Sequence, residues 1–313
     1  MILSVTLNPS IDRTVFVKSL VVGDTNRVLR TEIDAGGKGL NLSRIVGELG
    51  GTTVATGFLG GGPGGIVRER LEEAGVVSRF VEVAGATRVN FSVEAVDREV
   101  PPTTFNEPGP NISGAELEAL RHLLNDLAST YQGWVCLSGS VPPGVPRTIY
   151  RELGEQFLEA GWRVALDADG DLLREGLLCR PHFIKPNSAE VGRLLGRSVE
   201  TEEDALRAAV DARAMLQPDG IAIVSMGASG ATMATSEGQW LGVTPEVEAN
   251  STIGSGDSLI GAFLWALEQG HHVETALRWG LAAGAATATT DGSQIGPRQV
   301  IELLFDDARV EVR

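Results

Sequence analysis

The sequence predicts an α/β fold in which a mostly parallel central sheet carries helices on both faces. Two observations support this prediction: short apolar runs typical of buried strands recur along the chain, and helical patterns lie between them. A third observation adds a smaller feature, because two segments alternate polar and apolar residues with period two. At 313 residues the chain is long enough to bury a large core.

Six apolar runs have the length and composition of buried strands. They cover residues 2–7, 53–58, 134–137, 163–167, 182–185 and 220–225. Because helical segments separate them, we expect parallel strands whose carboxyl ends share one edge of the sheet. Ligands bind at that edge in open α/β sheets, so the residues that follow these strands are the first candidates for a functional site.

Capping residues mark the ends of the expected helices. Ser113 and Glu116 have the spacing of a capping box that opens a helix through about residue 128. Pro146 is expected to open a second helix, which Gly161 closes. Further helices are expected after the acidic segment at 201–204 and over about residues 40–49 and 259–268.

The segments around residues 14–34 and 87–105 predict the smaller sheet. In the second segment, Arg88, Asn90, Ser92 and Glu94 alternate with apolar residues and so form one polar face. A sheet with a polar face beside a ligand cleft is a candidate lid. We therefore expect one domain over residues 1–313, with a small β lid drawn from about residues 11–34 and 87–106.

Charge and composition exclude several classes of protein. With 41 acidic and 26 basic residues the formal net charge is −15, which argues against a nucleic-acid or anionic-membrane partner. Cys136 and Cys179 lie among apolar neighbours, as reduced and buried thiols do. The first residues lack the pattern of a signal peptide, and glycines break the uncharged stretch 52–67. We expect a soluble cytoplasmic protein.

Lysine is scarce, since Lys18, Lys38 and Lys185 are the only lysines among 26 basic residues. A compact ammonium and a planar guanidinium are not interchangeable where they bind an anion. Lys38 and Lys185 both lie in turns bounded by glycine or proline. The composition therefore raises the question of why arginine does not serve at these two positions.

The strongest functional motif covers residues 252–258, where Gly254, Ser255, Gly256 and Asp257 run directly into a helical pattern. Glycines at a helix start let backbone N–H groups approach an anion, and the helix dipole adds to the attraction. An aspartate there is placed to accept a proton from an attacking hydroxyl, which suits phosphoryl transfer. The alternative is that Asp257 only caps the helix.

A second glycine-rich turn, residues 35–41, contains Gly37, Lys38 and Asn41. It is not a Walker A loop, because its Gly-Lys pair is followed by Gly rather than by Ser or Thr. The turn predicts either a nest for a charged sugar substituent or a tight strand-to-helix connection with a solvated lysine.

Three more turns follow predicted strands. Asn187 and Glu190 have the spacing of a capping box, yet they also lie where a magnesium ion and nucleotide phosphates would bind near Lys185. The small residues at 225–230 would admit a flat ring or a phosphate, or form a simple hairpin. The turn at 138–144 brings hydroxyl groups to the carboxyl edge of the sheet. By contrast, the glycines at 57–62 lack the register of a dinucleotide-binding loop.

Taken together and in this order, these stretches resemble the ribokinase-like, phosphofructokinase-B family of carbohydrate kinases. The resemblance covers essentially the whole chain and is strongest to the 1-phosphofructokinase and tagatose-6-phosphate kinase branch. Eight motifs carry it, at residues 6–12, 23–28, 36–41, 87–90, 106–110, 138–144, 185–190 and 254–257.

The resemblance implies ATP and Mg²⁺, a hydroxymethyl acceptor on a furanose-form sugar phosphate, and a homodimer formed through the β lid. By position it makes Asp257 the general base and gives the anion hole to the amides of Gly254, Ser255 and Gly256. It implies that the nucleotide faces Lys185, Asn187, Ser225, Gly227, Gly230, Thr252 and Gly254, with Asn187 and Glu190 near the metal. It implies that the sugar phosphate faces Asp12, Arg27, Gly37, Lys38, Asn41, Arg88, Asn90, Ser138 and Asp257.

Two departures from the family pattern bear on the substrate. Ser255 replaces the usual alanine of Gly-Ala-Gly-Asp, a mild change because the backbone amides do the binding. Ser92 stands where this branch usually has a lysine, so one expected phosphate-facing cation is missing. Phosphofructokinases that act on fructose 6-phosphate also lack that lysine, but they lack a match to Lys38 as well.

The predicted reaction is therefore ATP-dependent phosphorylation of a ketohexose monophosphate, with fructose 1-phosphate converted to fructose 1,6-bisphosphate. Tagatose 6-phosphate, fructose 6-phosphate, an unphosphorylated sugar or a nucleoside stay open as alternative acceptors. A non-catalytic sugar-phosphate sensor would have lost the base or the glycine turn, and the sequence retains both.

Overall fold

The computed structural model describes residues 1–97 and 102–313, and its main feature is a ten-stranded sheet with the strand order β14-β13-β12-β11-β10-β9-β8-β1-β4-β5. Residues 98–101, part of the expected lid, lie outside the described residues. The strands are β1 (Ile2–Thr6), β4 (Thr53–Leu59), β5 (Val77–Glu82), β8 (Trp134–Ser138), β9 (Arg163–Asp167), β10 (Phe183–Ile184), β11 (Ile221–Ser225), β12 (Ala231–Ala234), β13 (Gln239–Val243) and β14 (Arg309–Val312).

The run of strands from β5 to β11 is parallel throughout, whereas β12, β13 and β14 extend it in antiparallel fashion. All six predicted strands are present, and their ends differ from the prediction by one residue at most. The α/β prediction with a mostly parallel central sheet is therefore confirmed.

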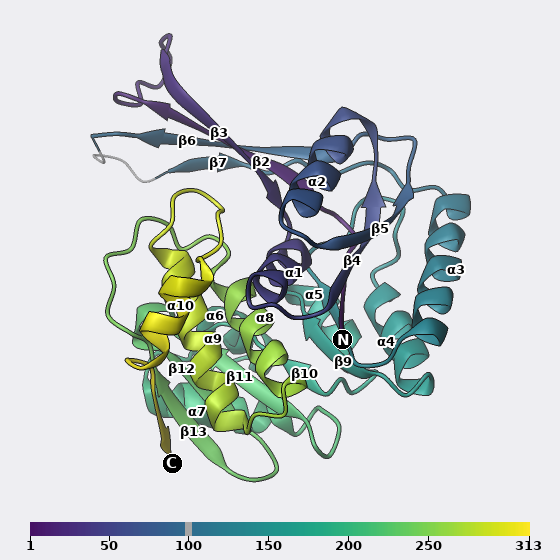
Figure 1. Ribbon diagram of the computed structural model, residues 1–313, viewed down its shortest axis with the longest axis vertical. Helices are drawn as coiled ribbons and strands as arrows, with labels where there is room; N and C mark the ends of the chain where they lie inside the picture. Colours follow the sequence, from purple (N-terminus) through teal and green to yellow (C-terminus); the bar gives the residue numbers. More distant parts are fainter. Residues whose placement is uncertain (98–101) are drawn as a thin grey trace.

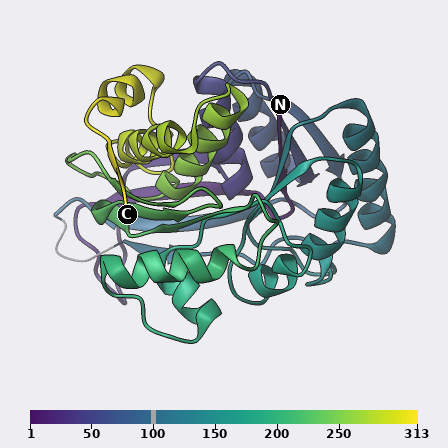
Figure 2. The same cartoon turned by 90° about the horizontal axis from the view of Figure 1, so that it is seen from below.

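Helices cover both faces of this sheet (Figure 2). One face is covered by α1 (Lys38–Glu48), α2 (Gly61–Glu73), α8 (Ser255–Glu268) and α9 (Val273–Ala288), with α10 (Arg298–Phe305) packed on α9. The other is covered by α3 (Gly114–Thr130), α4 (Ile149–Glu159), α5 (Gly170–Leu177), α6 (Ser188–Leu195) and α7 (Glu202–Arg213). Successive strand residues point to opposite faces. In β1, Leu3 and Val5 accordingly join the core under α3 and α4, while Ile2 joins the core under α8.

Both expected capping boxes are present: Ser113 with Glu116 and Asn187 with Glu190 exchange side-chain and backbone hydrogen bonds at the starts of α3 and α6. A third capping box, Thr201 with Asp204, lies at the start of α7, where an acidic helix start was expected. These bonds satisfy amide groups that the first helical turn leaves without partners. The sequence therefore encodes these three helix starts locally.

Several helices differ from the prediction: α5, α9 and α10 were not predicted, and α8 begins four residues before the expected start at about residue 259. Helix α4 begins at Ile149 rather than at Pro146, because the Pro146 carbonyl accepts from the Ile149 amide in a separate turn. Helix α2 was not predicted, since its first five residues are four glycines and a proline, which are poor helix formers. Its Val67 and Leu71 are fully buried against the sheet, and this tertiary packing outweighs the low propensity.

The smaller predicted sheet is present and projects from one end of the molecule (Figure 1). It has four strands in the order β3-β2-β6-β7, with β2 (Ser10–Val17), β3 (Val28–Gly36), β6 (Arg88–Ala95) and β7 (Thr103–Phe105). Strand β2 begins four residues after β1 ends, so the small sheet is anchored at the carboxyl edge of the main sheet. In the part of the chain that the structure describes, no helix is long and apolar enough to cross a membrane.

Candidate functional site

Two cavities meet at the carboxyl edge of the central strands. The first cavity, of about 470 Å³, lies between this edge and the small sheet. The second cavity, of about 430 Å³, lies beside the start of α8 and the hairpin between β11 and β12. Lys38, Glu190 and Asp257 line both cavities and mark the boundary between them. A ligand in one cavity would therefore contact a ligand in the other at these three side chains.

Most of the predicted site residues line one of these cavities. The first is lined by Asp12, Gly37, Lys38, Asn41, Arg88, Asn90 and Asp257. The second is lined by Lys185, Asn187, Ser225, Gly227, Gly230, Thr252, Ser255, Gly256 and Asp257. The division into two groups matches the one that the resemblance implies, although the role of each residue stays a prediction.

The start of α8 lies at the boundary between the two cavities. Gly254 is its N-cap and has a left-handed backbone with φ of 79°. No side chain caps this helix, in contrast to the capping boxes on α3, α6 and α7. The amides of the first turn have no intrahelical partner, so they are available to a ligand anion.

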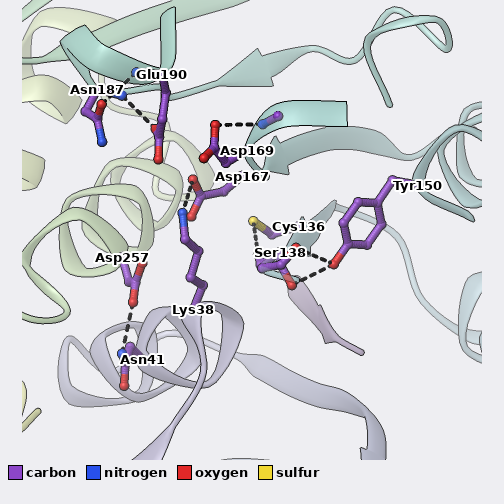
Figure 3. Close-up of polar contacts among 12 residues, drawn as sticks. Lys38, Asn41, Cys136, Ser138, Tyr150, Asp167, Asp169, Asn187, Glu190 and Asp257 are labelled. Atoms are coloured by element: carbon purple, nitrogen blue, oxygen red, sulfur yellow. Dashed lines mark hydrogen bonds and ion pairs between the residues drawn. The ribbon is translucent and has the colours of Figure 1, made fainter. Parts of the chain in front are cut away.

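Asp257 lies in this first turn and accepts a hydrogen bond of 2.9 Å from Asn41 Nδ2 (Figure 3). Burial, and after it the negative charge of Asp167, raise the pKa of the Asp257 carboxyl to about 6. Lys38, Asn41 and Lys185 act in the opposite direction and limit the increase. A carboxylate with this pKa is ionised at neutral pH and still basic enough to accept a proton there.

Lys38 begins α1 and forms an ion pair with Asp167, the last residue of β9, with 3.0 Å between Nζ and Oδ1 (Figure 3). Burial alone would lower the pKa of Lys38, but the charges of Asp167, Asp257 and Glu190 outweigh it and raise the pKa. Lys38 is therefore a permanent cation at the boundary of the two cavities.

Lys185 supplies a second ammonium group on the side of the second cavity. It follows β10 and is buried, with 6% of its surface exposed. Its Nζ lies 3.1 Å from the position that a Cβ on Gly256 would occupy. The absence of a side chain at Gly256 thus lets the ammonium approach the start of α8.

Asn187 and Glu190 form a capping box at the edge of the second cavity. The Asn187 side chain accepts from the Glu190 amide, while Glu190 Oε2 accepts from the Asn187 amide, so the capping box is complete. Both side chains also line the second cavity. In Figure 3 the Glu190 carboxylate points from α6 toward the boundary where Lys38 and Asp167 meet.

The small sheet contributes polar side chains to the first cavity. Asp12 Oδ1 accepts hydrogen bonds of 2.8 Å from Ser10 and from Asn90. Arg88 donates to the carbonyl oxygens of Asn8 and Glu107, both at 3.1 Å, and its guanidinium is thereby fixed against the cavity wall. Arg88 and Lys38 are the two cationic side chains among the described residues of this wall.

Unpartnered buried polar atoms gather around the cavities. Thr6 Oγ1, Asn8 Oδ1, Asn41 Oδ1, Asn90 Oδ1 and Ser255 Oγ have no hydrogen-bond partner among the described residues. Each of these residues lines one of the two cavities. A buried polar group without a partner costs about 1–3 kcal/mol. Their clustering points to a polar ligand that supplies the missing hydrogen bonds.

Three predicted residues lie outside the cavity walls. Arg27 is exposed in the loop between β2 and β3, at the far end of the small sheet. Ser138 is 1% exposed, and its hydroxyl pairs with Cys136 Sγ at 3.1 Å beneath the first cavity. Gly254 shapes the start of α8 but is not part of either wall. Ser92 is also buried, and its hydroxyl lies 3.3 Å from that of Thr104.

The structure adds site residues that sequence reasoning missed. Asp167 is the last residue of the predicted strand 163–167, and Asp169 lies two residues beyond it. Their position at the carboxyl end of a parallel strand was the signal that could have identified them. Asp169 lines the first cavity and holds Arg193 at 2.9 and 3.0 Å. Tyr150 lies beneath the turn after β8 and donates to the carbonyls of Ser138 and Gly139 (Figure 3).

The arrangement suits transfer of an anionic group between two bound molecules. A carboxylate that can accept a proton lies at the boundary, in the first turn of a helix that no side chain caps. Ammonium groups approach this point from Lys38 and from Lys185. Phosphoryl transfer uses this combination of a base, cationic side chains and backbone donors.

Comparison with known proteins relates this chain to carbohydrate kinases of one family. The model of the pfkB family carbohydrate kinase matches residues 5–299. A 1-phosphofructokinase from Vibrio cholerae is 33% identical over 310 residues, which cover 99% of this chain and 96% of that protein. Escherichia coli phosphofructokinase-2, solved in complex with substrates and products, has a TM-score of 0.90 at 27% identity and covers 98% of each chain.

The ribokinase of Arabidopsis thaliana, solved with ribose and ATP, has a TM-score of 0.76 at 22% identity over 97% of this chain and 98% of that chain. At this identity the likeness concerns the fold alone. It confirms the predicted ribokinase-like arrangement of a large, mostly parallel sheet with a smaller sheet beside it.

Proposed function

Because the chain belongs to the pfkB family of carbohydrate kinases, and is thus a phosphotransferase that acts on a sugar, we propose that it transfers the γ-phosphoryl group of ATP to fructose 1-phosphate. The product is fructose 1,6-bisphosphate. The observation that carries the proposal is the meeting of two cavities at Lys38, Glu190 and Asp257. Such a boundary lets donor and acceptor face each other in line.

The second cavity fits ATP. Its wall combines apolar residues such as Val247, Leu281 and Ala285, suited to a base, with the Lys185 ammonium near the start of α8. The unpartnered Ser255 Oγ and the uncapped helix amides provide donors for phosphate oxygens. Gly254, Ser255 and Gly256 then form the anion hole for the charge that develops on the γ-phosphoryl group.

Glu190 and Asn187 are the residues that would hold Mg²⁺. The ion prefers oxygen ligands and usually combines one or two protein side chains with phosphate oxygens and waters. Glu190 fits this role because its carboxylate lines both cavities while one oxygen stays in the capping box. When bound, the metal would neutralise charge on the transferred phosphate.

The first cavity takes the sugar phosphate. Asp12 and Asn90 offer hydrogen-bonding groups to sugar hydroxyls, and Arg88 offers a cation. Asp257 accepts the proton of the acceptor hydroxyl, whose oxygen then forms a bond to the γ-phosphorus. The bond from this phosphorus to the bridging oxygen breaks at the same time, and ADP leaves with the electron pair.

A panel of acceptors tests the proposal. Release of ADP is measured with fructose 1-phosphate, tagatose 6-phosphate, fructose 6-phosphate, an unphosphorylated ketohexose and a nucleoside. We expect the highest kcat/KM with fructose 1-phosphate. A preference for a 6-phosphate would instead follow from Ser92, which leaves its position without a cation. ATP binding without any turnover would favour a sugar-phosphate sensor and overturn the proposal.

We further propose that the protein is a cytoplasmic homodimer whose small sheet acts as both lid and dimer contact. Val22, Val28, Leu29 and Ile33 support this, because they are 92%, 53%, 62% and 40% exposed on that sheet and its loop. A second copy that covers these side chains would remove apolar surface from water. The cytoplasmic location is supported by two free and buried cysteines.

A further inference from the structure

The ion pair between Lys38 and Asp167 supports an inference that rests on the proposed function and deepens it. The Asp167 side chain is 4% exposed, whereas that of Lys38 is 36% exposed. A buried carboxylate therefore holds an ammonium group that still faces the open site. The question is which part of the two substrates this ammonium contacts.

The fold fixes both partners of the pair. Asp167 ends β9 and lies in register with Ser138 on the neighbouring strand β8. Lys38 follows Gly37, whose φ of 132° lies outside the range that side chains favour. A Cβ on Gly39 would lie 2.5 Å from Thr6 Oγ1, so the first turn of α1 packs directly against the end of β1. The backbone that carries Lys38 is thus fixed against the end of β1.

An ammonium group has three N–H donors. Among the residues that the structure describes, Asp167 is the hydrogen-bond partner of Lys38, at 3.0 Å. Two donors are therefore free for a ligand. Because the neighbouring acidic groups keep Lys38 protonated, it binds as a cation and takes no part in proton transfer.

Lys38 and Arg88 occupy different parts of the site. Lys38 lines both cavities, whereas Arg88 lines only the first. Arg88 is tied to the Asn8 and Glu107 carbonyls on the side of the small sheet. A phosphate carried by the acceptor can reach Arg88 without approaching the second cavity. The transferred phosphate must instead pass the boundary where Lys38 lies.

We infer that Lys38 contacts the phosphoryl group in transfer rather than the phosphate that the sugar already carries, and that Asp167 is the residue that positions Lys38. As the acceptor oxygen bonds to the γ-phosphorus and the bond to the bridging oxygen of ADP breaks, the free N–H donors of Lys38 stabilise charge on the γ-phosphoryl oxygens. The hydroxyl proton goes to Asp257, and Lys38 stays protonated throughout.

The test compares Lys38→Gln with Arg88→Gln in the full chain, with fructose 1-phosphate and ATP. For Lys38→Gln we expect kcat to fall about 10²–10³-fold, the usual cost of one transition-state donor. Binding of fructose 1-phosphate without nucleotide, measured by calorimetry, should change less than about threefold. For Arg88→Gln we expect the reverse pattern, with weaker binding and a smaller loss of kcat.

The positioning role of Asp167 is tested by the same two measurements, kcat and the binding of fructose 1-phosphate. Asp167→Asn should lower kcat without weakening sugar-phosphate binding, and Asp167→Glu should recover part of the loss because it keeps a carboxylate. Lys38→Gln leaves Asp167 buried without its cation, which is destabilising. The double variant Lys38→Gln/Asp167→Asn removes both charges, and we expect it to fold and to keep the same loss of kcat.

Two results would overturn the inference. One is a Lys38→Gln or double variant that retains kcat but binds fructose 1-phosphate more than tenfold more weakly, which would make Lys38 the anchor of the sugar's own phosphate. That result would leave the proposed function intact. The other is the absence of turnover by the unsubstituted protein, which would overturn the proposed function and the inference with it.

Discussion

Asn41 on α1 donates a hydrogen bond of 2.9 Å to Asp257 on α8, joining two helices whose residues are 216 positions apart in the chain. The bond stabilises the ionised carboxylate and fixes its orientation. It occupies Asp257 Oδ2 and leaves Oδ1 for an acceptor hydroxyl. The proposed base is therefore held by a residue of another helix that lines the same cavity.

The pH dependence of turnover follows from Asp257. Burial and the nearby charge of Asp167 raise its pKa to about 6, and only the ionised form accepts a proton. We expect kcat/KM to fall about tenfold for each pH unit below 6. A pH profile from 5 to 8 measures this. Asp167→Asn removes one raising charge, so its acid limb should move to lower pH, while a flat profile down to pH 5 would contradict the assignment.

A substitution at Gly256 tests whether the Lys185 ammonium must lie close to the start of α8 for ATP to bind. A Cβ at Gly256 would lie 3.1 Å from Lys185 Nζ, so Gly256→Ala should displace the ammonium. Because the tip of the lysine needs to move only a few tenths of an ångström, we expect the KM for ATP to rise about two- to fivefold, less than the loss of one charged hydrogen bond would cause. Gly65→Ala is the matched control, because Gly65 lies in α2 with no atom within 4 Å of its Cβ position. Equal ATP affinity in both variants would contradict the proposed role of Lys185.

Tyr150 supports the turn beneath the first cavity. Its hydroxyl donates to the carbonyls of Ser138 and Gly139, at 2.8 and 3.1 Å. Tyr150→Phe should lower the free energy of unfolding by about 1–2 kcal/mol, because it leaves these carbonyls without a donor. Tyr131, the other tyrosine, is 42% exposed, and Tyr131→Phe should change stability by less than about 0.5 kcal/mol. Urea unfolding of both variants measures the difference.

The proposed dimer contact is tested by placing a charge on the small sheet. Leu29 is 62% exposed on β3, and Leu29→Asp should convert a dimer to a monomer because a buried, unpaired charge is costly at an interface. Leu303 is 71% exposed on α10, so Leu303→Asp is a control of similar exposure elsewhere. Sedimentation velocity measures whether each variant is a monomer or a dimer, and we expect the control to stay a dimer. A dimer that survives Leu29→Asp would place the contact elsewhere.

Local sequence signals predicted much of the fold. Capping boxes such as Asn187 with Glu190 define helix starts within four residues, and apolar runs define the parallel strands. Helix α2 could not be predicted in this way, since its glycine-rich start becomes helical only when Val67 and Leu71 pack on the sheet.

The sequence predicted some residues of the site and missed others, because local motifs do not show which distant residues meet in the fold. Lys185 was identified because it follows the parallel strand β10, whose end lies at the carboxyl edge. Lys38 and Asp257 were identified from the glycines at the starts of α1 and α8. The partner of Lys38 was not predictable, since Asp167 lies 129 residues away and meets it only through the strand order. Arg27 was assigned by resemblance alone, and within one chain it lies outside both cavities.

The most direct test of phosphoryl transfer with Asp257 as the base is the kcat of Asp257→Asn with ATP and fructose 1-phosphate. We expect a loss of about 10²–10⁴-fold. The fold should persist: a raised carboxyl pKa means that stability is lost as pH rises through about 6, so at pH 7.5 a neutral amide should not lower the unfolding temperature. A folded Asp257→Asn variant with unchanged kcat would contradict the proposed mechanism.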